Sequence, residues 1–399
     1  MTDLNRPALR AIALATFLTL VPITLLVPGL NELISVAHGG TRFQSHLFVS
    51  LNQLTGIVAV PFVMRWHRKL PDTRLWIFAL LALDAVSFIG MGAADSLGEL
   101  FAWRAIDGLA HLPAVTLLIL AANRAGGARR GASLGVVAAA LMVGVGVGAP
   151  VGGILVDRDP SLVYSVGAAL LAVAAITALS IPRLAIIGDP SPRSRYAWDR
   201  SHVASWMPLA YGFADRFLIG VFVSTFTLFL AEVHGASAAT RGMLMSLFLL
   251  PFAALCWPAG RLADRVGWYG PIVTANILFG LLYASYGLIP LSLLPVAMVL
   301  SGILSAMMFS PSLVLVSEFA RRGAGEGLFG VFQVAGAFGF LFGPLTGGLL
   351  VETMRGDDGN PAWAMIFAVV GVLLVGLGLL SWRVLGRLSA EWRAAPLLD

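Results

Sequence analysis

Long runs of residues almost without charge dominate this chain, and they leave few folds open to it. A helix needs about 20 mostly apolar residues to cross a bilayer, and each run is about that long or longer. The run 266–317 is too long for one helix and divides naturally at Gly287–Pro290. The runs cover residues 11–31, 43–64, 75–94, 100–123, 131–156, 160–182, 201–231, 242–260, 266–317, 327–351 and 360–382.

These runs predict an all-α membrane protein with twelve transmembrane helices, six in each half of the chain. Hydrophobic residues make up 58% of the 399 residues and charged residues only 12%, whereas soluble domains carry about 25% charged residues. No stretch alternates apolar and polar residues as the strands of a membrane barrel do. The first run shows no cleavable signal pattern, so we expect it to remain as the first span. The single cysteine, Cys256, excludes a disulfide framework and a cysteine metal site.

The basic residues are distributed unequally between the two sets of connections. An even number of spans puts both termini on one side, and the set on that side holds twenty basic residues. The opposite set holds four, which are Arg42, Arg158, Arg241 and Arg355. Because positive charge is retained in the cytoplasm, we expect both termini to be cytoplasmic, in a cell (inner) membrane. The net charge of +5 is spread over short loops, which argues against nucleic-acid binding.

A glycine–proline stretch occurs twice, 195 residues apart, and indicates two similar halves. The first copy covers residues 144–155, and the second, 343–350, corresponds to residues 148–155 of the first. The shift superposes Gly148 on Gly343, Gly152 on Gly347 and Gly153 on Gly348, and it puts Pro150 and Pro344 one place apart. We expect two pseudo-symmetric six-helix bundles, 1–182 and 201–399, joined by a cytoplasmic linker, 183–200. No strand precedes Gly144-x-Gly146, which excludes a dinucleotide-binding fingerprint.

Two six-helix halves joined by a basic loop resemble the major facilitator superfamily, and three motifs support this. Residues 258–267, between helices 8 and 9, resemble the superfamily's cytoplasmic loop signature. Residues 103–108 on helix 4 resemble its arginine motif, with Asp107 where glutamine is more usual. Residues 148–153 resemble the Gly-Pro-Gly-Gly signature of the twelve-helix drug:proton antiporter branch. The resemblance implies transport by alternating access, with the substrate cavity between helices 1, 4, 7 and 10.

Two departures from the family pattern concern coupling and gating. The loop between helices 2 and 3 keeps its basic residues but lacks the glycine and aspartate of the loop signature. Helix 1 carries no acidic residue in its core, since Glu32 lies at its outer end. Many antiporters of this branch carry a carboxylate in helix 1, so the coupling group is expected elsewhere.

Of the 21 acidic residues, only Asp84, Asp107 and Asp215 lie well inside expected spans. A charge at the centre of a membrane helix costs roughly 2.5–3.5 kcal/mol, so such residues are functional candidates. Arg104, Asp107 and His111 follow at i, i+3 and i+7, which puts them on one face of helix 4. We expect proton coupling at these residues, first at Asp107, with Asp84 and Asp215 in reserve. The alternative is a structural ion pair between helices.

Other residues are candidates for gating and for substrate contact. Asp215 and Arg216 are adjacent and should point about 100° apart, so they are not expected to satisfy one another. Asp264 is expected to act at a gate, as a cap for a nearby helix, or to be a solvated loop residue. The gating candidates are Gly148, Pro150, Gly152, Gly260, Arg261, Asp264, Arg265, Gly343, Pro344 and Gly347. The cavity candidates are Phe213, Arg216, Phe217, Phe222, Ser305 and Met307.

Few hydrogen-bonding groups accompany these aromatic side chains, which favours an amphipathic organic substrate over a sugar or a phosphate. We therefore expect a secondary transporter, with proton-coupled efflux as the leading hypothesis. An uptake permease for a siderophore-like or peptide-like molecule, an uncoupled facilitator and a membrane receptor are the alternatives. No nucleophile–base pattern or metal-ligand spacing predicts an enzyme. We expect no cofactor beyond a proton gradient, and a monomer.

Overall fold

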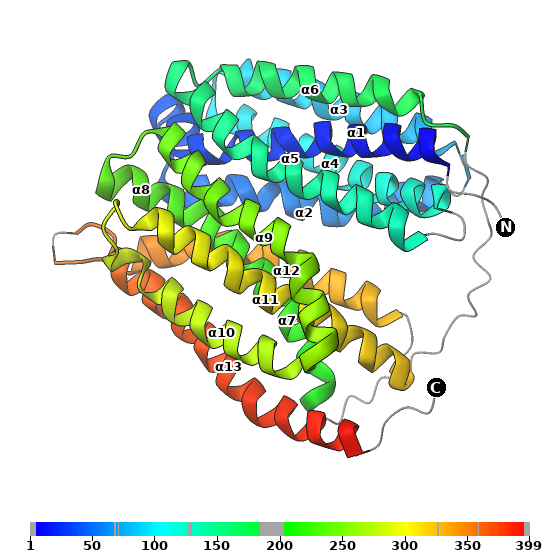
Figure 1. Cartoon of the computed structure of the whole chain (residues 1–399). Coiled ribbons are helices and arrows are strands. Elements are labelled where there is room, and N and C mark those ends of the chain that lie inside the picture. Colours follow the sequence, from blue (N-terminus) through cyan, green and yellow to red (C-terminus); the bar gives the residue numbers. More distant parts are fainter. Residues whose placement is uncertain are drawn as a thin grey trace. The chain divides into compact units, whose positions relative to one another are not determined.

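Helices make up nearly all of the regular structure (Figure 1). The computed structural model describes residues 5–67, 69–70, 72–126, 130–183, 203–324, 327–357 and 359–394. Within these residues, twelve helices are long and apolar enough to cross a membrane, which confirms the expected number of spans. The all-α fold class is also confirmed. Of the expected linker 183–200, only Arg183 belongs to the described residues.

The elements of the first half are α1 (Arg6–Leu25), η1 (Val27–Gly29), η2 (Asn31–Val36), α2 (Arg42–His67), α3 (Thr73–Gly92), α4 (Leu97–Ala125), α5 (Arg130–Arg158) and α6 (Leu162–Leu179). Those of the second half are α7 (Val203–Val221), η4 (Phe222–Phe226), α8 (Thr227–His234), α9 (Ala238–Val266), α10 (Tyr269–Ala284), η5 (Tyr286–Leu288), α11 (Leu294–Phe319), η6 (Ala320–Ala324), α12 (Gly327–Thr353) and α13 (Trp363–Ala394).

Several spans contain more than one element. The seventh span joins α7, the π-helical η4 and α8 into one stretch, Val203–His234. Spans eight to twelve are therefore α9, α10 with η5, α11, α12 and α13. The long run 266–317 divides between Leu288 and Leu294, next to the expected break. The last helix continues past residue 382 to Ala394, because the residues that follow the apolar run include no proline.

Short local signals set several helix ends. The Ser96 hydroxyl accepts a hydrogen bond from the Glu99 amide at 3.2 Å, and the Glu99 carboxylate accepts one from the Asp95 amide at 3.0 Å. This arrangement satisfies free amides at the start of α4. At the end of α8, Gly235 adopts φ +55°, a left-handed conformation that glycine tolerates and that stops the helix.

The chain forms two compact units. Unit 1 contains residues 1–189 and 223–246, and unit 2 contains residues 190–222 and 247–399. In unit 1, α1 packs on α5 and α6, and α3 packs on α4 and α6. In unit 2, α7 packs on α12, and α10 packs on α11 and α13. The pairing of spans 1 and 5 thus corresponds to that of spans 7 and 11, in agreement with the internal repeat.

The compact units do not follow the boundary between the sequence halves. Segment 223–246, which contains η4, α8 and the first residues of α9, belongs to unit 1 although it lies in the second half of the chain. Its side chains are largely buried there, including Thr225 and Arg241.

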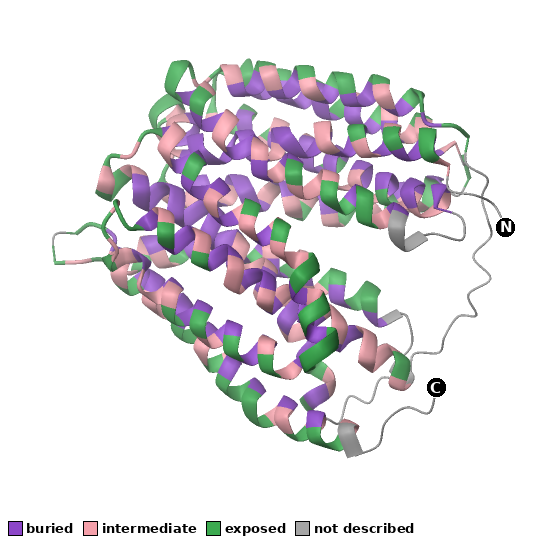
Figure 2. Ribbon diagram, in the orientation of Figure 1, coloured by how far each residue is buried: buried purple, intermediate pink, exposed green. Residues whose placement is uncertain are grey.

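Exposed residues recur along the helices (Figure 2), and many of them are large and apolar. Ile89, Ile176, Val372 and Leu373 are each more than 60% exposed, whereas buried polar side chains lie inside the bundles. Hydrocarbon accepts apolar side chains and does not satisfy polar groups, so these surfaces suit a bilayer. This is the surface of a multi-pass membrane protein.

The repeated glycines lie where helix backbones come closest. A methyl group on Gly148 would meet Val21 and Thr24 of α1, and one on Gly343 would meet Phe217 and Gly220 of α7. Gly152 likewise faces the backbone of Leu25 in α1. Each glycine therefore allows its helix to pack directly against the first span of its own half. Small residues permit this close packing between membrane helices.

We expect Gly148→Ala and Gly343→Ala to destabilise the protein by about 1–3 kcal/mol each, because the added methyl group has no space. Gly135 and Gly330 are matched controls, since they are related by the same shift of 195 residues. A methyl group on either would meet nothing within 4 Å. Thermal unfolding in detergent should therefore show a lower Tm for the first pair only. Equal Tm values for all four variants would contradict the packing role.

Candidate functional site

The polar face of α4 lies against α2 because a glycine permits close contact. A methyl group on Gly108 would meet the backbone of Asn52 and the Thr55 side chain, so only glycine allows this approach of the two helices. The contact brings Asn52 of α2 next to Asp107 of α4. The arginine motif on helix 4 thus includes the residue that makes its polar network possible.

Asp107 is held by two donors. Its Oδ2 accepts hydrogen bonds from Nη1 of Arg104 at 2.6 Å and from Nδ2 of Asn52 at 2.7 Å. The Arg104 guanidinium also donates through Nε to the Phe48 carbonyl at 3.2 Å and lies 4.6 Å from the centre of the Phe48 ring. The Arg104 side chain is 4% exposed and that of Asp107 is fully buried. Hydrogen bonds between charged groups are stronger than those between neutral groups. They therefore fix the positions of the Arg104 and Asp107 side chains.

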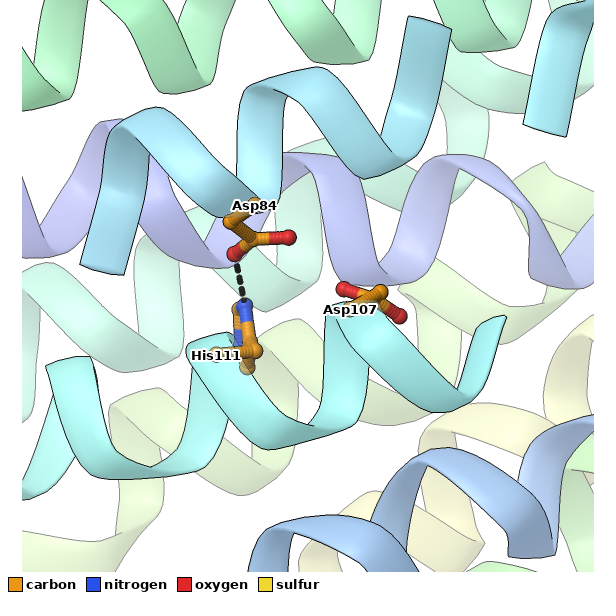
Figure 3. A group of neighbouring side chains, drawn as sticks. All are labelled: Asp84, Asp107 and His111. Atoms are coloured by element: carbon orange, nitrogen blue, oxygen red, sulfur yellow. Dashed lines mark hydrogen bonds and ion pairs between the residues drawn. The ribbon is translucent and has the colours of Figure 1, made fainter. Parts of the chain in front are cut away.

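Asp84 of α3 and His111 of α4 form a second pair beside it (Figure 3). Nδ1 of His111 lies 2.9 Å from Oδ2 of Asp84. Both side chains are nearly or fully buried, at 8% and 0% exposed. The structure therefore brings together four of the five predicted coupling residues, from two helices of unit 1. Asp84, placed in reserve on sequence grounds, is a full member of this cluster.

One oxygen or nitrogen atom from each of Asp84, Asp107 and His111 lies within 4.8 Å of the other two. Such a spacing is compatible with a bound cation, but Arg104 already supplies a positive charge to Asp107. We therefore assign no metal to the cluster and treat it as a buried network of ionisable groups.

The fifth coupling candidate, Asp215, lies in α7 of unit 2. Its Oδ2 is 3.6 Å from Nε of Arg216, which is an ion pair without a hydrogen bond. Both Asp215 oxygens are buried and have no hydrogen-bond partner among the described residues. Adjacent helix positions explain this incomplete contact, since the two side chains leave the helix in different directions. The Arg216 guanidinium instead lies 5.3 Å from the Phe309 ring of α11.

The cavity candidates have different environments in unit 2. Phe213 and Phe217 are half-buried and stacked, with ring centres 5.5 Å apart. Phe222 is buried against Phe248 and Tyr286, with ring centres at 5.0 and 6.4 Å. Ser305 is buried in α11, and its neighbour Met307 is half-buried. Phe222 and Ser305 are therefore packed inside unit 2.

The gating candidates of the loop signature lie at the end of α9. Arg261, Asp264 and Arg265 are exposed, and the Arg261 guanidinium lies 4.7 Å from the Trp257 ring. Asp264 makes no hydrogen bond to another described residue, so a capping contact is not among those seen. Gly260 is half-buried, and Gly267 ends the helix with φ +87°. Pro150, Pro344 and Gly347 lie inside α5 and α12.

Segment 223–246 meets the first six helices through polar contacts that the sequence did not reveal. Arg241, 1% exposed, forms an ion pair with Glu32 of η2. The Asp157 carboxylate at the end of α5 accepts hydrogen bonds from the amides of Ala238 and Ala239, at 2.8 and 3.0 Å, and so caps α9. The other polar contacts are Arg42–Glu232 at 2.6 Å, His46–Thr225 at 3.1 Å and Ser246 to the Gly146 carbonyl at 2.7 Å.

Close backbone approach accompanies these contacts. A methyl group on Gly153 would meet the Ala238 backbone, and one on Gly242 would meet Ala149 and Pro150. The antiporter-like stretch of α5 therefore has two neighbours, α1 through Gly148 and Gly152, and α9 through Gly153.

Asn52 was also missed by the sequence analysis. It is one of several uncharged polar residues in the run 43–64, so nothing in the sequence singles it out. A search for buried amides as well as buried charges would have included it.

Comparison with known proteins agrees with this fold. The profile of the Major Facilitator Superfamily matches residues 12–229 and 209–396. A putative multidrug resistance protein MdtD from Klebsiella pneumoniae (strain 342) is 31% identical over 171 residues, which are 42% of this chain and 35% of that protein. The methyl viologen resistance protein SmvA from Salmonella typhimurium (strain LT2) is 30% identical over 154 residues, 38% of this chain and 30% of that protein. The matched stretch thus spans about a third of these relatives.

Solved structures with the same fold cover almost the whole chain. The nucleoside transporter NupG has a TM-score of 0.75 at 14% identity, over 95% of this chain and 99% of that one. A bacterial homologue of the lysosomal transporter Spinster, solved in an inward-facing and unoccupied conformation, has a TM-score of 0.77 at 13% identity, over 96% and 98%. At these identities the likeness concerns the fold.

We expect Arg104→Leu and Asp107→Leu, made singly, to destabilise the protein by about 3–5 kcal/mol, because each leaves one buried charge without its partner. The double variant should recover most of this loss, since it removes both charges. The exposed pair Arg355–Glu352 has the same spacing of three residues and is a matched control. Its variants should change stability by about 1 kcal/mol or less. Tm values measured by intrinsic fluorescence test this. Additive losses in the double variant would contradict the pairing.

Proposed function

Because this chain belongs to the major facilitator superfamily, we propose that it exports a small amphipathic organic molecule in exchange for protons. Transport by alternating access, with the proton gradient as the driving force, is the specific form of this proposal. The coarser conclusion, that the protein is a membrane transporter, follows from its family.

The buried network of α3 and α4 is the observation that carries the proton-coupled part. Arg104, Asp107, Asp84 and His111 occupy the interior of membrane-spanning helices, where each charge costs roughly 2.5–3.5 kcal/mol. Helix packing alone does not require such groups, since apolar residues of similar size pack as well or better. A buried carboxylate–histidine pair is suited to gain and lose a proton.

Efflux and substrate class are supported by the relatives and by the aromatic residues of unit 2. The partial relatives are named for multidrug and methyl viologen resistance, and export of a toxic compound is one way to confer resistance. Phe213, Phe217 and Phe309 offer aromatic surface, and Arg216 and Asp215 are the charged groups near it. Such a surface suits flat or amphipathic organic molecules. We further propose a monomer in the cell inner membrane, with both termini in the cytoplasm and no nucleic-acid partner.

Purified full-length protein in proteoliposomes tests the proposal. Ethidium, methyl viologen and the neutral dye Nile red are the probes, and an outward proton gradient is imposed by an acidic lumen. We expect at least one probe to accumulate inside the vesicles, because protons leaving the lumen drive its entry in exchange. Nigericin should abolish the accumulation, and protein-free vesicles are the control.

Other outcomes distinguish the alternatives. Accumulation only with an alkaline lumen would indicate proton symport and therefore uptake. Equal movement with and without the gradient would indicate an uncoupled facilitator, and either result would overturn the efflux proposal.

Alternating access requires that contacts on one side of the site break during the cycle. Segment 223–246 is held against the first six helices by the ion pair between buried Arg241 and half-buried Glu32 and by the Asp157 cap of α9. Arg42, Arg158 and Arg241 belong to the connections expected outside the cytoplasm. We propose that these contacts form the closed barrier on the non-cytoplasmic side.

We expect Glu32→Arg to open this barrier, because it puts two positive charges together where Arg241 is buried. The readout is labelling of Ser224→Cys, in a Cys256→Ser background, by a membrane-impermeant maleimide added from the non-cytoplasmic side. Labelling should rise at least fivefold with Glu32→Arg and fall again in the charge-swapped Glu32→Arg/Arg241→Glu protein. The corresponding swap at the more exposed Arg42–Glu232 pair should change labelling less. Unchanged labelling in Glu32→Arg would refute the barrier.

A further inference from the structure

The two carboxylates of the α3–α4 cluster have different neighbours. Asp107 receives two hydrogen bonds on one oxygen, from Arg104 and from Asn52 of α2. Asp84 contacts the imidazole of His111 through Oδ2 and also lies beside the carboxylate of Asp107, and its Oδ1 is buried without a hydrogen bond to another described residue. Donors to a carboxylate favour its charged form. Asp107 therefore has a permanently charged donor, Arg104, whereas no such donor contacts Asp84 among the described residues.

The charge balance of the cluster leaves room for one exchangeable proton. Arg104 carries a positive charge that Asp107 neutralises at 2.6 Å. The Asp84 carboxylate with a neutral His111 then leaves one net negative charge, in a site where all four side chains are at most 8% exposed. One proton on the Asp84–His111 pair makes the cluster neutral. An isolated buried charge is costly. The neutral cluster, with the proton, and the negatively charged cluster, without it, therefore differ in free energy.

We infer that the Asp84–His111 pair carries the coupled proton, while Asp107, fixed by Arg104 and Asn52, is a constant counter-charge. This inference rests on the proposed proton-coupled transport and names the group that performs it. It also changes the order of the candidates, since the sequence alone favoured Asp107 and placed Asp84 in reserve. Protonation of Asp107 would instead weaken its bond to Arg104 and leave a buried guanidinium without its anion.

His111 is the member of the pair through which the proton passes. Its side chain retains 8% exposure, whereas that of Asp84 is fully buried. A proton from water binds Nε2 of His111, and Nδ1 transfers its own proton to Oδ2 of Asp84. The imidazole is then neutral again, with its hydrogen on Nε2, and the carboxyl group is neutral. The reverse transfer releases one proton and restores the carboxylate, so charge and protons balance.

The groups around the pair determine how readily it releases the proton. Arg104 of α4 brings a positive charge close to the pair, and Asp107 brings a negative one. Tyr164 of α6 is buried against Gly92 of α3, and its hydroxyl has no partner among the described residues. A movement of α3 against α4 that separates Asp84 from His111 would change the affinity for the proton. Transport and protonation are coupled in this way.

Two measurements in proteoliposomes test the assignment, with ethidium as the probe. The first is accumulation driven by an acidic lumen, and the second is counterflow of labelled against unlabelled ethidium without a gradient. Asp84→Asn should lose at least tenfold in driven accumulation and keep counterflow, which also shows that it folds. Asp84→Glu, which keeps an ionisable group, should retain driven accumulation with a shifted pH profile. His111→Gln should lower the driven rate at least fivefold without lowering counterflow.

The decisive comparison is with the double variant Arg104→Gln/Asp107→Asn, which removes the fixed pair without leaving a net charge. It should be slower than the unmodified protein but still gradient-driven. The exposed Asp95→Asn is the control for loss of an acidic residue. If the double variant loses driven accumulation while Asp84→Asn keeps it, Asp107 carries the proton and the inference is wrong. Counterflow without driven accumulation in the unmodified protein would refute proton coupling itself. Absence of both activities with ethidium, methyl viologen and Nile red would refute the proposed transport function.

Discussion

The free-energy cost of a charge inside a membrane determines how the buried ionisable side chains of this protein are paired. Arg104 and Asp107 neutralise one another in unit 1, with Asn52 and the Phe48 carbonyl taking up further hydrogen bonds. The neighbouring Asp84 pairs with a histidine and lies beside the Asp107 carboxylate. A hydrocarbon surrounding gives each unpaired charge a large free energy, so the protonation of one side chain decides between a neutral and a charged interior. The proposed coupling of transport to protons uses this difference.

Close contacts between backbones set the geometry in which this chemistry takes place. Gly108 lets α2 approach α4 and brings Asn52 to Asp107. Gly148 and Gly343 do the same for α5 on α1 and for α12 on α7, once in each half. Membrane helices gain little from burying apolar surface against one another, because lipid is equally apolar, so close packing at small residues and hydrogen bonds hold them together.

The two halves share a pattern of helix packing but differ in their charges. Unit 1 contains a hydrogen-bonded network of four ionisable side chains on α3 and α4, whereas in unit 2 Asp215 and Arg216 meet at 3.6 Å without a hydrogen bond. A repeat therefore preserves the backbone contacts of its glycines while the polar residues diverge. This division agrees with a proton site in the first half and aromatic substrate surface in the second.

Several features followed from the sequence by itself. The twelve spans were predictable because a bilayer imposes a fixed length on each apolar run, and the halves because Gly148 and Gly343 repeat at one shift. The single face formed by Arg104, Asp107 and His111 followed from helical periodicity. Only the tertiary structure decided that Asp84 joins them from α3, that Asn52 fixes Asp107, and that Glu32 meets Arg241 across 209 residues. Such pairings depend on which helix faces which and at what height, and periodicity along one helix contains no information about the rotation of its neighbour.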